Sequence, residues 1–351
     1  MYTLCECLLA FLGGGETVRL VSLFSGCGGM DYGFIQAGYE IVFANDFDSD
    51  AQRVYNLNFG AHIDCRDIRD VTTSEIPDCE ILTAGFPCQP FSNAGNRKGV
   101  ADERGNLYKE CFRIVENKKP MVVVFENVRG FLSTKDENGN KLVDTIEDIF
   151  ESLNYTVSYK LVICSDYQVP QNRYRVIMVA IRKDLGKKFV FPELVPKDGL
   201  EVGNIIDLPN DISGQVDWQL SPQAKMLIEY IPEGGSWKDI PYEVLPERFK
   251  KIRDNMKKYR SPNFYRRFAR TEINGTITAS AQPENCGILH PLENRRYTVR
   301  EIARFQSFPD SFEFIFDSVK DIVGMYKVVG NAVPPRLAET FGNAIKQQVF
   351  L

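Results

Sequence analysis

Short runs of apolar residues, each ended by glycine, proline or a polar residue, recur along the first half of the chain. Runs this short are typical of buried strands, since helices usually need about ten residues or more. They predict strands at residues 18–24, 39–44, 80–84, 120–125, 161–163 and 176–181. The last two runs are closely connected, which predicts an antiparallel hairpin added to a parallel sheet. The fold class is therefore expected to be α/β.

Four further segments are predicted to be helical. Residues 30–37 follow the first strand, and a second helix is expected to begin at Leu107. Thr298 with Glu301 three residues later is a capping-box pair, which predicts a helix start. A last helix is expected over residues 336–347, after a proline pair.

Regular patterning ends near Lys183, where prolines begin to interrupt a stretch of weak periodicity. We expect residues 185–297 to form a smaller, irregular domain. Residues 1–17 precede the first predicted strand and form an N-terminal extension to which we assign no role. Their apolar segment is short and lacks a basic start, so it is neither a convincing signal peptide nor a membrane span.

Composition narrows the class of protein without defining its function. The chain has 351 residues, a net charge of -5, 44% hydrophobic residues and 25% charged residues, as in an ordinary globular protein. Nine cysteines with no C-x-x-C pair, together with only two histidines, suggest neither a metal site nor a disulfide framework. We expect reduced thiols, a cytoplasmic location and no membrane partner.

A glycine turn, Ser25-Gly26-Cys27-Gly28-Gly29, joins the first predicted strand to the first helix. Nucleotide-binding βα units have this arrangement, although a glycine cluster alone also makes a tight turn. Asp46 follows the next strand about 20 residues later, where an acid that binds a ribose hydroxyl is expected, and Phe47 could cover an adenine face. Asp67, before Ile68, could reach the adenine amino group, but an aspartate there is also a usual helix cap. The spacing does not separate a dinucleotide from S-adenosylmethionine.

The octet Gly85-Phe86-Pro87-Cys88-Gln89-Pro90-Phe91-Ser92 directly follows the predicted strand 80–84. It places Cys88 at the carboxyl edge of the sheet, where α/β proteins bind their ligands. A lone intracellular cysteine is most often a buried thiol. The flanking prolines hold this one rigidly at a strand end, which favours a nucleophile.

Charged residues follow two other predicted strands. Glu126 ends the most apolar run, at the same edge as Cys88, where a carboxylate has to be solvated, paired or functional. Arg173 and Arg175 are two residues apart and are expected to face the same side of a strand, in a position to bind a carboxylate or a phosphate.

The segment 248–270 concentrates positive charge in an acidic chain, with aromatic residues between the basic ones. A solvated helix face is the ordinary interpretation of such a run. It is also the local pattern that nucleic acid requires. The candidate nucleic-acid-binding residues of this segment are Arg248, Lys250, Lys251, Lys257, Lys258, Arg260, Arg266 and Arg267.

These motifs together resemble the cytosine-5 DNA methyltransferase family, over residues 18–351. The matching segments are Phe24–Gly29, Gly85–Ser92, Phe125–Val128, Gln171–Arg175, Thr276–Ser280, Arg295–Asp310 and Val329–Pro335. The resemblance implies a Rossmann-like S-adenosylmethionine-dependent methyltransferase fold. In it, a catalytic and cofactor-binding domain (18–184) is joined to a target-recognition domain (185–297), a hinge (298–325) and a C-terminal helix (326–351) that completes the catalytic domain.

The resemblance also implies roles for individual residues. Cys88 would add to carbon 6 of a flipped-out cytosine, Glu126 would act at ring nitrogen 3, and Arg173, with Arg175, would steady the carboxylate and the base. The residues implied to contact S-adenosylmethionine are Phe24, Ser25, Gly26, Cys27, Gly28, Gly29, Asp46, Phe47, Asp67, Ile68, Pro87, Leu107, Asn331 and Ala332.

The implied partner is double-stranded DNA, and the resemblance adds Thr278 to the basic residues expected to bind it. The implied role is the modification half of a restriction-modification system, with a restriction endonuclease as functional counterpart and the enzyme itself a monomer. Three alternatives stay open at this point. A tRNA cytosine methyltransferase would carry a Cys-Phe-Thr tripeptide, which is absent; an inactive DNA-binding relative would lack Cys88 or Glu126; a nicotinamide oxidoreductase would not explain a cysteine between prolines.

Overall fold

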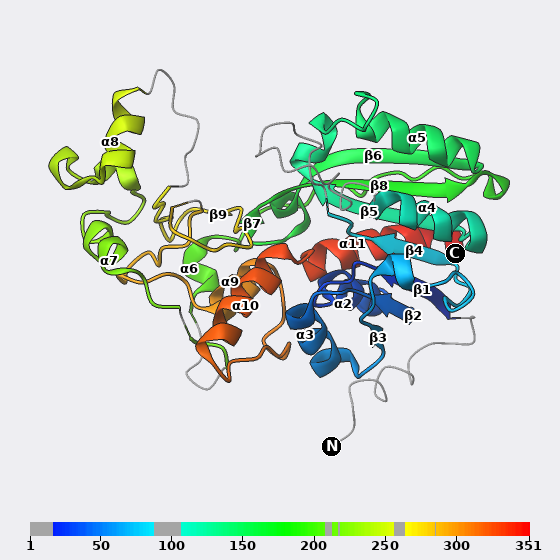
Figure 1. Ribbon diagram of the computed structural model, residues 1–351, viewed down its shortest axis with the longest axis horizontal. Coiled ribbons are helices and arrows are strands. Elements are labelled where there is room, and N and C mark those ends of the chain that lie inside the picture. Colours follow the sequence, from blue (N-terminus) through cyan, green and yellow to red (C-terminus); the bar gives the residue numbers. More distant parts are fainter. Residues whose placement is uncertain (1–16, 88–106, 208–212, 217, 256–263, 285) are drawn as a thin grey trace.

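The computed structural model describes residues 17–87, 107–207, 213–216, 218–255, 264–284 and 286–351. A large α/β domain lies beside a smaller and less regular region (Figure 1). Cys88, Lys257, Lys258 and Arg260 lie outside the described residues, and so do residues 1–16.

The large domain is built on one seven-stranded sheet with the order β3-β2-β1-β4-β5-β8-β6. Its strands are β1 (Val18–Leu23), β2 (Tyr39–Asn45), β3 (Ile63–Asp64), β4 (Ile81–Ala84), β5 (Val122–Val128), β6 (Tyr155–Ile163) and β8 (Tyr174–Arg182). The first five are parallel, whereas β8 runs antiparallel to both β5 and β6. The predicted parallel sheet with its antiparallel hairpin is confirmed.

The strand order reverses direction between β1 and β4. From β1 the chain builds outward through β2 and β3, then returns to place β4 and β5 on the other side of β1. A sheet of this kind opens a crevice at the carboxyl ends of the two strands where the order reverses. The segments that leave these ends are the glycine turn after Leu23 and the Gly85–Pro87 segment after Ala84.

Helices cover both faces of the sheet. They are α2 (Gly29–Gln36), α3 (Ser49–Phe59), α4 (Leu107–Lys118), α5 (Leu142–Ser152) and α11 (Pro335–Ile345). Alternate residues of β5 enter opposite cores: Val123 and Phe125 pack with α4 and α5, whereas Val122 and Val124 pack with α2 and α11. Helix α11, near the end of the chain, thus completes the core that it forms with α2 and with strands from the first half of the chain (Figure 1).

The smaller region, residues 185–297, is called here the small domain. Its helices are α6 (Val202–Ile205), α7 (Pro222–Ile228) and α8 (Glu247–Asp254), and its short strand β9 (Asn274–Gly275) pairs with β7 (Gln171–Asn172) of the large domain. Its own core gathers around the buried Trp237. This small amount of regular structure is consistent with the weak periodicity of the sequence.

Two helices lead back to the large domain, α9 (Val299–Phe305) and α10 (Val319–Asn331). The predicted capping box is present, because the Thr298 hydroxyl accepts from the Glu301 amide at 3.2 Å and the Glu301 carboxylate accepts from the Thr298 amide at 2.6 Å. The predicted boundary at residue 325 falls inside α10, so hinge and C-terminal segment share one helix.

Candidate active site

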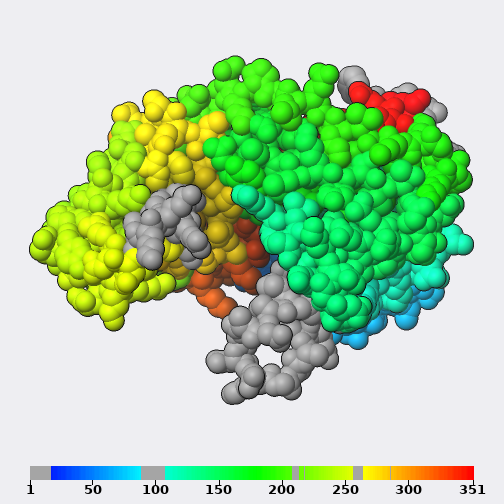
Figure 2. All heavy atoms as spheres, turned by 90° about the horizontal axis from the view of Figure 1, so that it is seen from above, coloured from blue at the N-terminus to red at the C-terminus, as the bar shows by residue number. Residues whose placement is uncertain are grey.

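A cavity of about 810 Å³ opens at the carboxyl edge of the sheet, at the point where the strand order reverses. Its walls come from the ends of β1, β2, β4 and β5, from the start of β8, from the small-domain segment 276–279 and from the end of α10. Seen from above, the surface is hollowed between the small domain and the large domain, with the orange-red atoms of the α10 region deep in the hollow (Figure 2). A volume of this size suits a cofactor and a substrate group together.

The glycine turn forms one wall of the cavity. The Gly26 amide donates to the Asp46 carboxylate at 2.8 Å, and the Asp48 amide donates to the other oxygen of the same carboxylate at 2.8 Å. Burial raises the pKa of Asp46. Gly26 has a φ of +57°, and a Cβ at this position would meet no atom within 4 Å, so the turn leaves open space above the backbone.

Asp31, on α2, is a fully buried carboxylate close to this turn. It accepts hydrogen bonds from the Ser22 hydroxyl at 2.6 Å and from the Tyr55 hydroxyl at 2.9 Å. Burial raises its pKa to about 6, while the two hydroxyls act in the opposite direction. The described residues place no cation against it, so this carboxylate depends on neutral donors alone.

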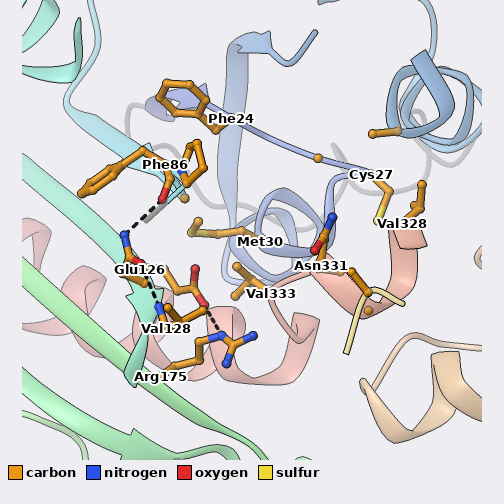
Figure 3. Close-up of a pocket in the computed structure, with 18 of the residues that line it drawn as sticks. Phe24, Cys27, Met30, Phe86, Glu126, Val128, Arg175, Val328, Asn331 and Val333 are labelled. Carbon is orange, nitrogen blue, oxygen red and sulfur yellow. Dashed lines mark hydrogen bonds and ion pairs between the residues drawn. The ribbon is translucent and has the colours of Figure 1, made fainter. Parts of the chain in front are cut away.

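The opposite wall holds a buried ion pair. Glu126, on β5, accepts from the Nε of Arg175, on β8, at 2.7 Å, and each side chain is 10% exposed (Figure 3). Arg175 also donates to the Tyr174 carbonyl at 2.7 Å. The pair follows from the antiparallel register, which places Glu126 opposite Ile177 and Val128 opposite Arg175. A carboxylate held in this way presents its second oxygen to a substrate with a fixed orientation.

The structure corrects the prediction that Arg173 is the main partner of Glu126. The Arg173 side chain is 1% exposed and donates to the carbonyls of Ile277, Gly330 and Ala332, at 2.9, 2.9 and 3.2 Å. Burial lowers its pKa to about 9, and the neighbouring Arg175 adds to this effect. Arg173 lies just before β8 rather than on it, so it joins the small-domain segment to the end of α10, and Arg175 alone pairs with Glu126.

The segment that leads to Cys88 is anchored to the same strand. Phe86 is buried against the rings of Phe125 and Phe131, and its carbonyl accepts from the Asn127 amide group at 3.1 Å (Figure 3). Pro87, the residue before Cys88, lines the cavity. Asn127 was not predicted, although its place directly after Glu126 at a strand end was a visible signal.

Most of the predicted cofactor-contacting residues line the cavity. These are Phe24, Ser25, Gly26, Cys27, Asp46, Phe47, Pro87, Leu107, Asn331 and Ala332, and Thr278 is a further lining residue.

Four of the predicted residues do not line it. A Cβ at Gly28 would lie 2.2 Å from the Phe59 ring and one at Gly29 would lie 2.4 Å from the Val333 carbonyl, so these glycines permit close packing instead. Asp67 is paired with Arg69 and accepts from the Arg69 amide as the cap of a short helical turn, the alternative that the sequence left open. Ile68 is 2% exposed and packs in the core.

Lys327 is a further lining residue that sequence reasoning missed. Its ammonium group contacts the carboxylate of Asp48, which lowers the Asp48 pKa. It lies four residues before Asn331 on α10, and this helical spacing was the signal that could have revealed it.

The basic segment of the small domain requires a correction at Arg267. This side chain is 2% exposed and donates to the carbonyls of Ile228, His290 and Glu293 and to the side-chain oxygen of Asn294. Burial lowers its pKa. A buried guanidinium used in this way supports the fold and does not contact phosphates.

The other described members of the segment differ from one another. Arg266 is paired with Glu272 and lies over the Phe268 ring, and Lys250 is paired with Glu247. Arg248 and Lys251 are exposed on α8, as a DNA-facing surface requires.

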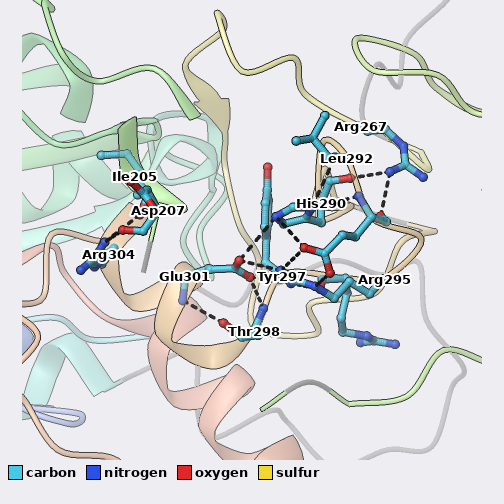
Figure 4. Close-up of polar contacts among 12 residues, drawn as sticks. Ile205, Asp207, Arg267, His290, Leu292, Arg295, Tyr297, Thr298, Glu301 and Arg304 are labelled. Atoms are coloured by element: carbon cyan, nitrogen blue, oxygen red, sulfur yellow. Dashed lines mark hydrogen bonds and ion pairs between the residues drawn. The ribbon is translucent and has the colours of Figure 1, made fainter. Parts of the chain in front are cut away.

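A dense polar network connects the small domain to α9 (Figure 4). Glu301, 1% exposed, accepts from both terminal nitrogens of Arg295, at 2.8 and 2.9 Å, and His290 Nε2 lies 3.7 Å from the same carboxylate. His290 Nδ1 accepts from the amides of Leu292 and Glu293. Burial lowers the His290 pKa, with Arg295 as the next cause. The junction is therefore fixed by side chains rather than by regular structure.

A glycine turn at the reversal point of an α/β sheet, facing a buried carboxylate–guanidinium pair across one cavity, defines an enzyme that binds a nucleotide-like cofactor beside a polar substrate group. The chain belongs to the C-5 cytosine-specific DNA methylase family, whose model matches residues 18–347. It is therefore a DNA (cytosine-5-)-methyltransferase, and the resemblance predicted from the motifs is confirmed.

Individual relatives and solved structures agree with the family match. The chain is 38% identical over 329 residues to the type II methyltransferase M.NgoFVII of Neisseria gonorrhoeae, covering 91% of this chain and 83% of that one. It is 33% identical over 356 residues to M.FnuDI of Fusobacterium nucleatum, covering 94% of each. A putative DNA modification methyltransferase from an Escherichia coli prophage has the same fold, with a TM-score of 0.67, 21% identity and coverage of 95% of this chain and all 100% of that one.

No helix within the described residues is long and apolar enough to cross a membrane.

Proposed function

We propose that this enzyme transfers a methyl group from S-adenosylmethionine to carbon 5 of a cytosine extruded from a specific short duplex sequence, through a covalent adduct at Cys88. The observation that carries the proposal is that two different walls face each other across one cavity. One wall has the glycine turn with Asp46, and the other has the Glu126–Arg175 pair.

The glycine-turn wall fits the cofactor. The carboxylate of Asp46 is held by two backbone amides, and because each carboxylate oxygen has two acceptor positions it can still accept from ribose hydroxyls. Phe47 is 59% exposed at the same wall and offers a ring face to adenine. S-adenosylmethionine supplies a methyl group activated by a positively charged sulfur.

The β5 wall fits the cytosine ring. In its protonated form Glu126 donates a proton to ring nitrogen 3 through the oxygen that Arg175 leaves free, and Arg175 keeps the carboxyl group in place. The Cys88 thiolate forms a bond to carbon 6, and the ring electrons move to make carbon 5 nucleophilic. After carbon 5 is methylated, loss of its proton to a base expels the Cys88 thiolate and restores the aromatic ring.

A cytosine stacked within a duplex cannot reach these residues. The Glu126 and Arg175 side chains are each 10% exposed at the wall of a cavity, so the base has to leave the helix to meet them. The adjoining small domain is the natural site for reading the flanking sequence, and Arg248 and Lys251 on α8 are among its exposed cations.

We further propose that the enzyme is the modification half of a restriction-modification system. Several relatives that match over most of this chain are named type II methyltransferases, including M.NgoFVII, M.FnuDI and M.PspPI of a Psychrobacter strain. Methylation of one short sequence would then protect host DNA from an endonuclease of the same specificity.

Cys88→Ser tests the mechanism. The variant should lose methyl transfer, measured with tritiated cofactor, while its affinity for the cofactor stays nearly unchanged because the glycine-turn wall is intact. DNA that carries 5-fluorocytosine should form a stable adduct with the wild-type enzyme, because fluorine does not leave as a proton does. Turnover by Cys88→Ser would overturn the mechanism, and bisulfite sequencing of DNA from expressing cells would identify the target base and its context.

A further inference from the structure

Among the described residues four cations line the cavity, and three of them are paired with a carboxylate or donate to backbone carbonyls. Arg175 is paired with Glu126, Lys327 is paired with Asp48, and Arg173 donates to backbone carbonyls. Arg129 is the exception: in the described part of the chain its guanidinium contacts the ring of Tyr174, 5.4 Å from the centroid, and no carboxylate.

The register of the sheet explains why Arg129 meets Tyr174. Val128 is the last residue of β5 and pairs with Arg175, where the β5–β8 ladder ends. Arg129, which begins a short helical turn, and Tyr174, the first residue of β8, are the residues next to this last pair and therefore lie close together. Arg129 is exposed, and Tyr174 is 37% exposed. A guanidinium that lies over an aromatic ring keeps the N–H donors at its edge free for a second partner.

We infer that Arg129, supported by the Tyr174 ring, binds a backbone phosphate next to the extruded cytosine. This inference rests on the proposed function. A base that enters the cavity is attached to a sugar that carries a phosphodiester on each side, and these charged groups have to stay at the rim. Arg129 directly follows the strand that carries Glu126, so it lies where the phosphate of the same nucleotide has to pass.

The distribution of charge favours a phosphate over the cofactor's own carboxylate. Among the lining carboxylates, Glu126 and Asp48 are paired with cations, whereas within the described part of the chain Asp46 accepts from backbone amides and from no cation. The unpaired negative charge therefore lies on the glycine-turn wall, which suits a cationic cofactor. The unpaired positive charge lies on the β5 wall, which suits DNA.

Arg129→Gln tests the inference, with equilibrium binding to a fluorescent DNA duplex measured over a series of salt concentrations. The affinity should fall roughly tenfold, and the slope of log affinity against log salt should flatten by about 0.9, the value for one phosphate contact. Affinity for S-adenosylmethionine should stay unchanged. Arg129→Lys should keep the slope, because the charge remains, and Tyr174→Phe should bind as the wild type does.

Lys160→Gln is the matched control, because Lys160 also lies over an aromatic ring, Phe191, without lining the cavity. Its salt slope should equal that of the wild type. An unchanged slope and affinity for Arg129→Gln would show that Arg129 is a solvated surface residue and overturn the inference. So would weaker cofactor binding with an unchanged DNA slope.

Binding to a duplex with one unpaired cytosine, which is already outside the base stack, requires neither methyl transfer nor a particular recognition sequence. If the wild-type enzyme methylates DNA but Arg129→Gln retains its slope on this duplex, the inference fails and the proposed function stands. If the wild-type enzyme methylates no DNA, the proposed function fails, and the duplex with the unpaired cytosine still tests the phosphate contact.

Discussion

The large domain and the small domain use the same buried side chain, arginine, for opposite purposes. At the edge of the sheet Arg175 meets a carboxylate inside the cavity. In the small domain Arg267 donates to main-chain carbonyls of neighbouring loops. Strands satisfy their own carbonyls in the ladder, whereas an irregular chain needs donors from elsewhere. Regular structure therefore leaves charge available for chemistry, and irregular structure uses it for folding.

Arg173 lies where the two regions meet and shares features of both. Like Arg175, it lines the cavity. Like Arg267, it donates its N–H groups to backbone carbonyls, which here belong to the small-domain segment 276–279 and to the end of α10. Burial lowers the Arg173 pKa to about 9, which means that a positive charge is unfavourable at this position. The contrast between the regions is thus one of backbone regularity rather than of distance from the cavity.

The largest expected effect is on chemistry in the large domain. Glu126→Gln keeps the shape and a hydrogen bond to Arg175 but removes the acid, so the rate of methyl transfer should fall by roughly 10²-fold or more while DNA affinity changes little. Single-turnover kinetics measure this directly. Glu80→Gln is the control, because Glu80 accepts from the Arg19 amide at the opposite end of the sheet and should leave the rate unchanged. An unaltered rate for Glu126→Gln would make its carboxylate merely structural.

The next effect is on stability in the small domain. Arg267→Met leaves buried carbonyls without donors and should lower the free energy of unfolding by about 3 kcal/mol. Both tryptophans of the chain, Trp218 and Trp237, lie in the small domain, so urea unfolding followed by tryptophan fluorescence reports on this region.

The salt dependence of DNA binding sharpens the same comparison. Arg267→Met should leave the salt slope unchanged, because its side chain is 2% exposed. Arg248→Met, in the same basic segment but exposed, should change stability by less than about 0.5 kcal/mol. If Arg267→Met flattened the slope without loss of stability, the assignment of Arg267 to the fold would be wrong.

The smallest effect concerns Asp31, a buried carboxylate of the large domain that no cation of the described residues contacts. The Asp31 pKa is raised from 3.8 to about 6, so the folded state holds this proton more tightly than the unfolded state does. Its stabilising contribution is fully present below about pH 4 and is lost as the pH rises through about 6. Relative to Asp31→Asn, the wild type should lose on the order of 2 kcal/mol across this window. Unfolding curves of both proteins from acid to neutral pH test this, and a difference that does not change with pH would contradict it.

The sequence predicted the parts of the site that local rules define. The strand ends, the glycine turn, Glu126 and the last helix follow from runs, turns and caps, which are properties of neighbouring residues. The partner of Glu126 depends on strand register, and a prediction that Arg173 and Arg175 share one strand could not show that β8 begins between them. Register is a tertiary property, set by pairing across the sheet.

The basic segment shows the opposite limit. Its aromatic residues indicated nucleic acid, but Phe249 and Tyr265 pack around Trp237 in the small-domain core. Arg267 is buried beside them because nearby loop carbonyls lack other donors. Composition does not show which carbonyls will lack donors.

The position of α11 has a consequence for how the protein is made. The core formed with β1, β4 and β5 includes Leu337, Phe341 and Ile345 of α11. The large domain therefore lacks one layer until these residues have left the ribosome. During synthesis the residues around Trp237 can pack first. The sheet, although it is made earlier, still has one apolar face without its covering helix. In a nascent chain the core of the small domain can thus be complete before the core of the large domain.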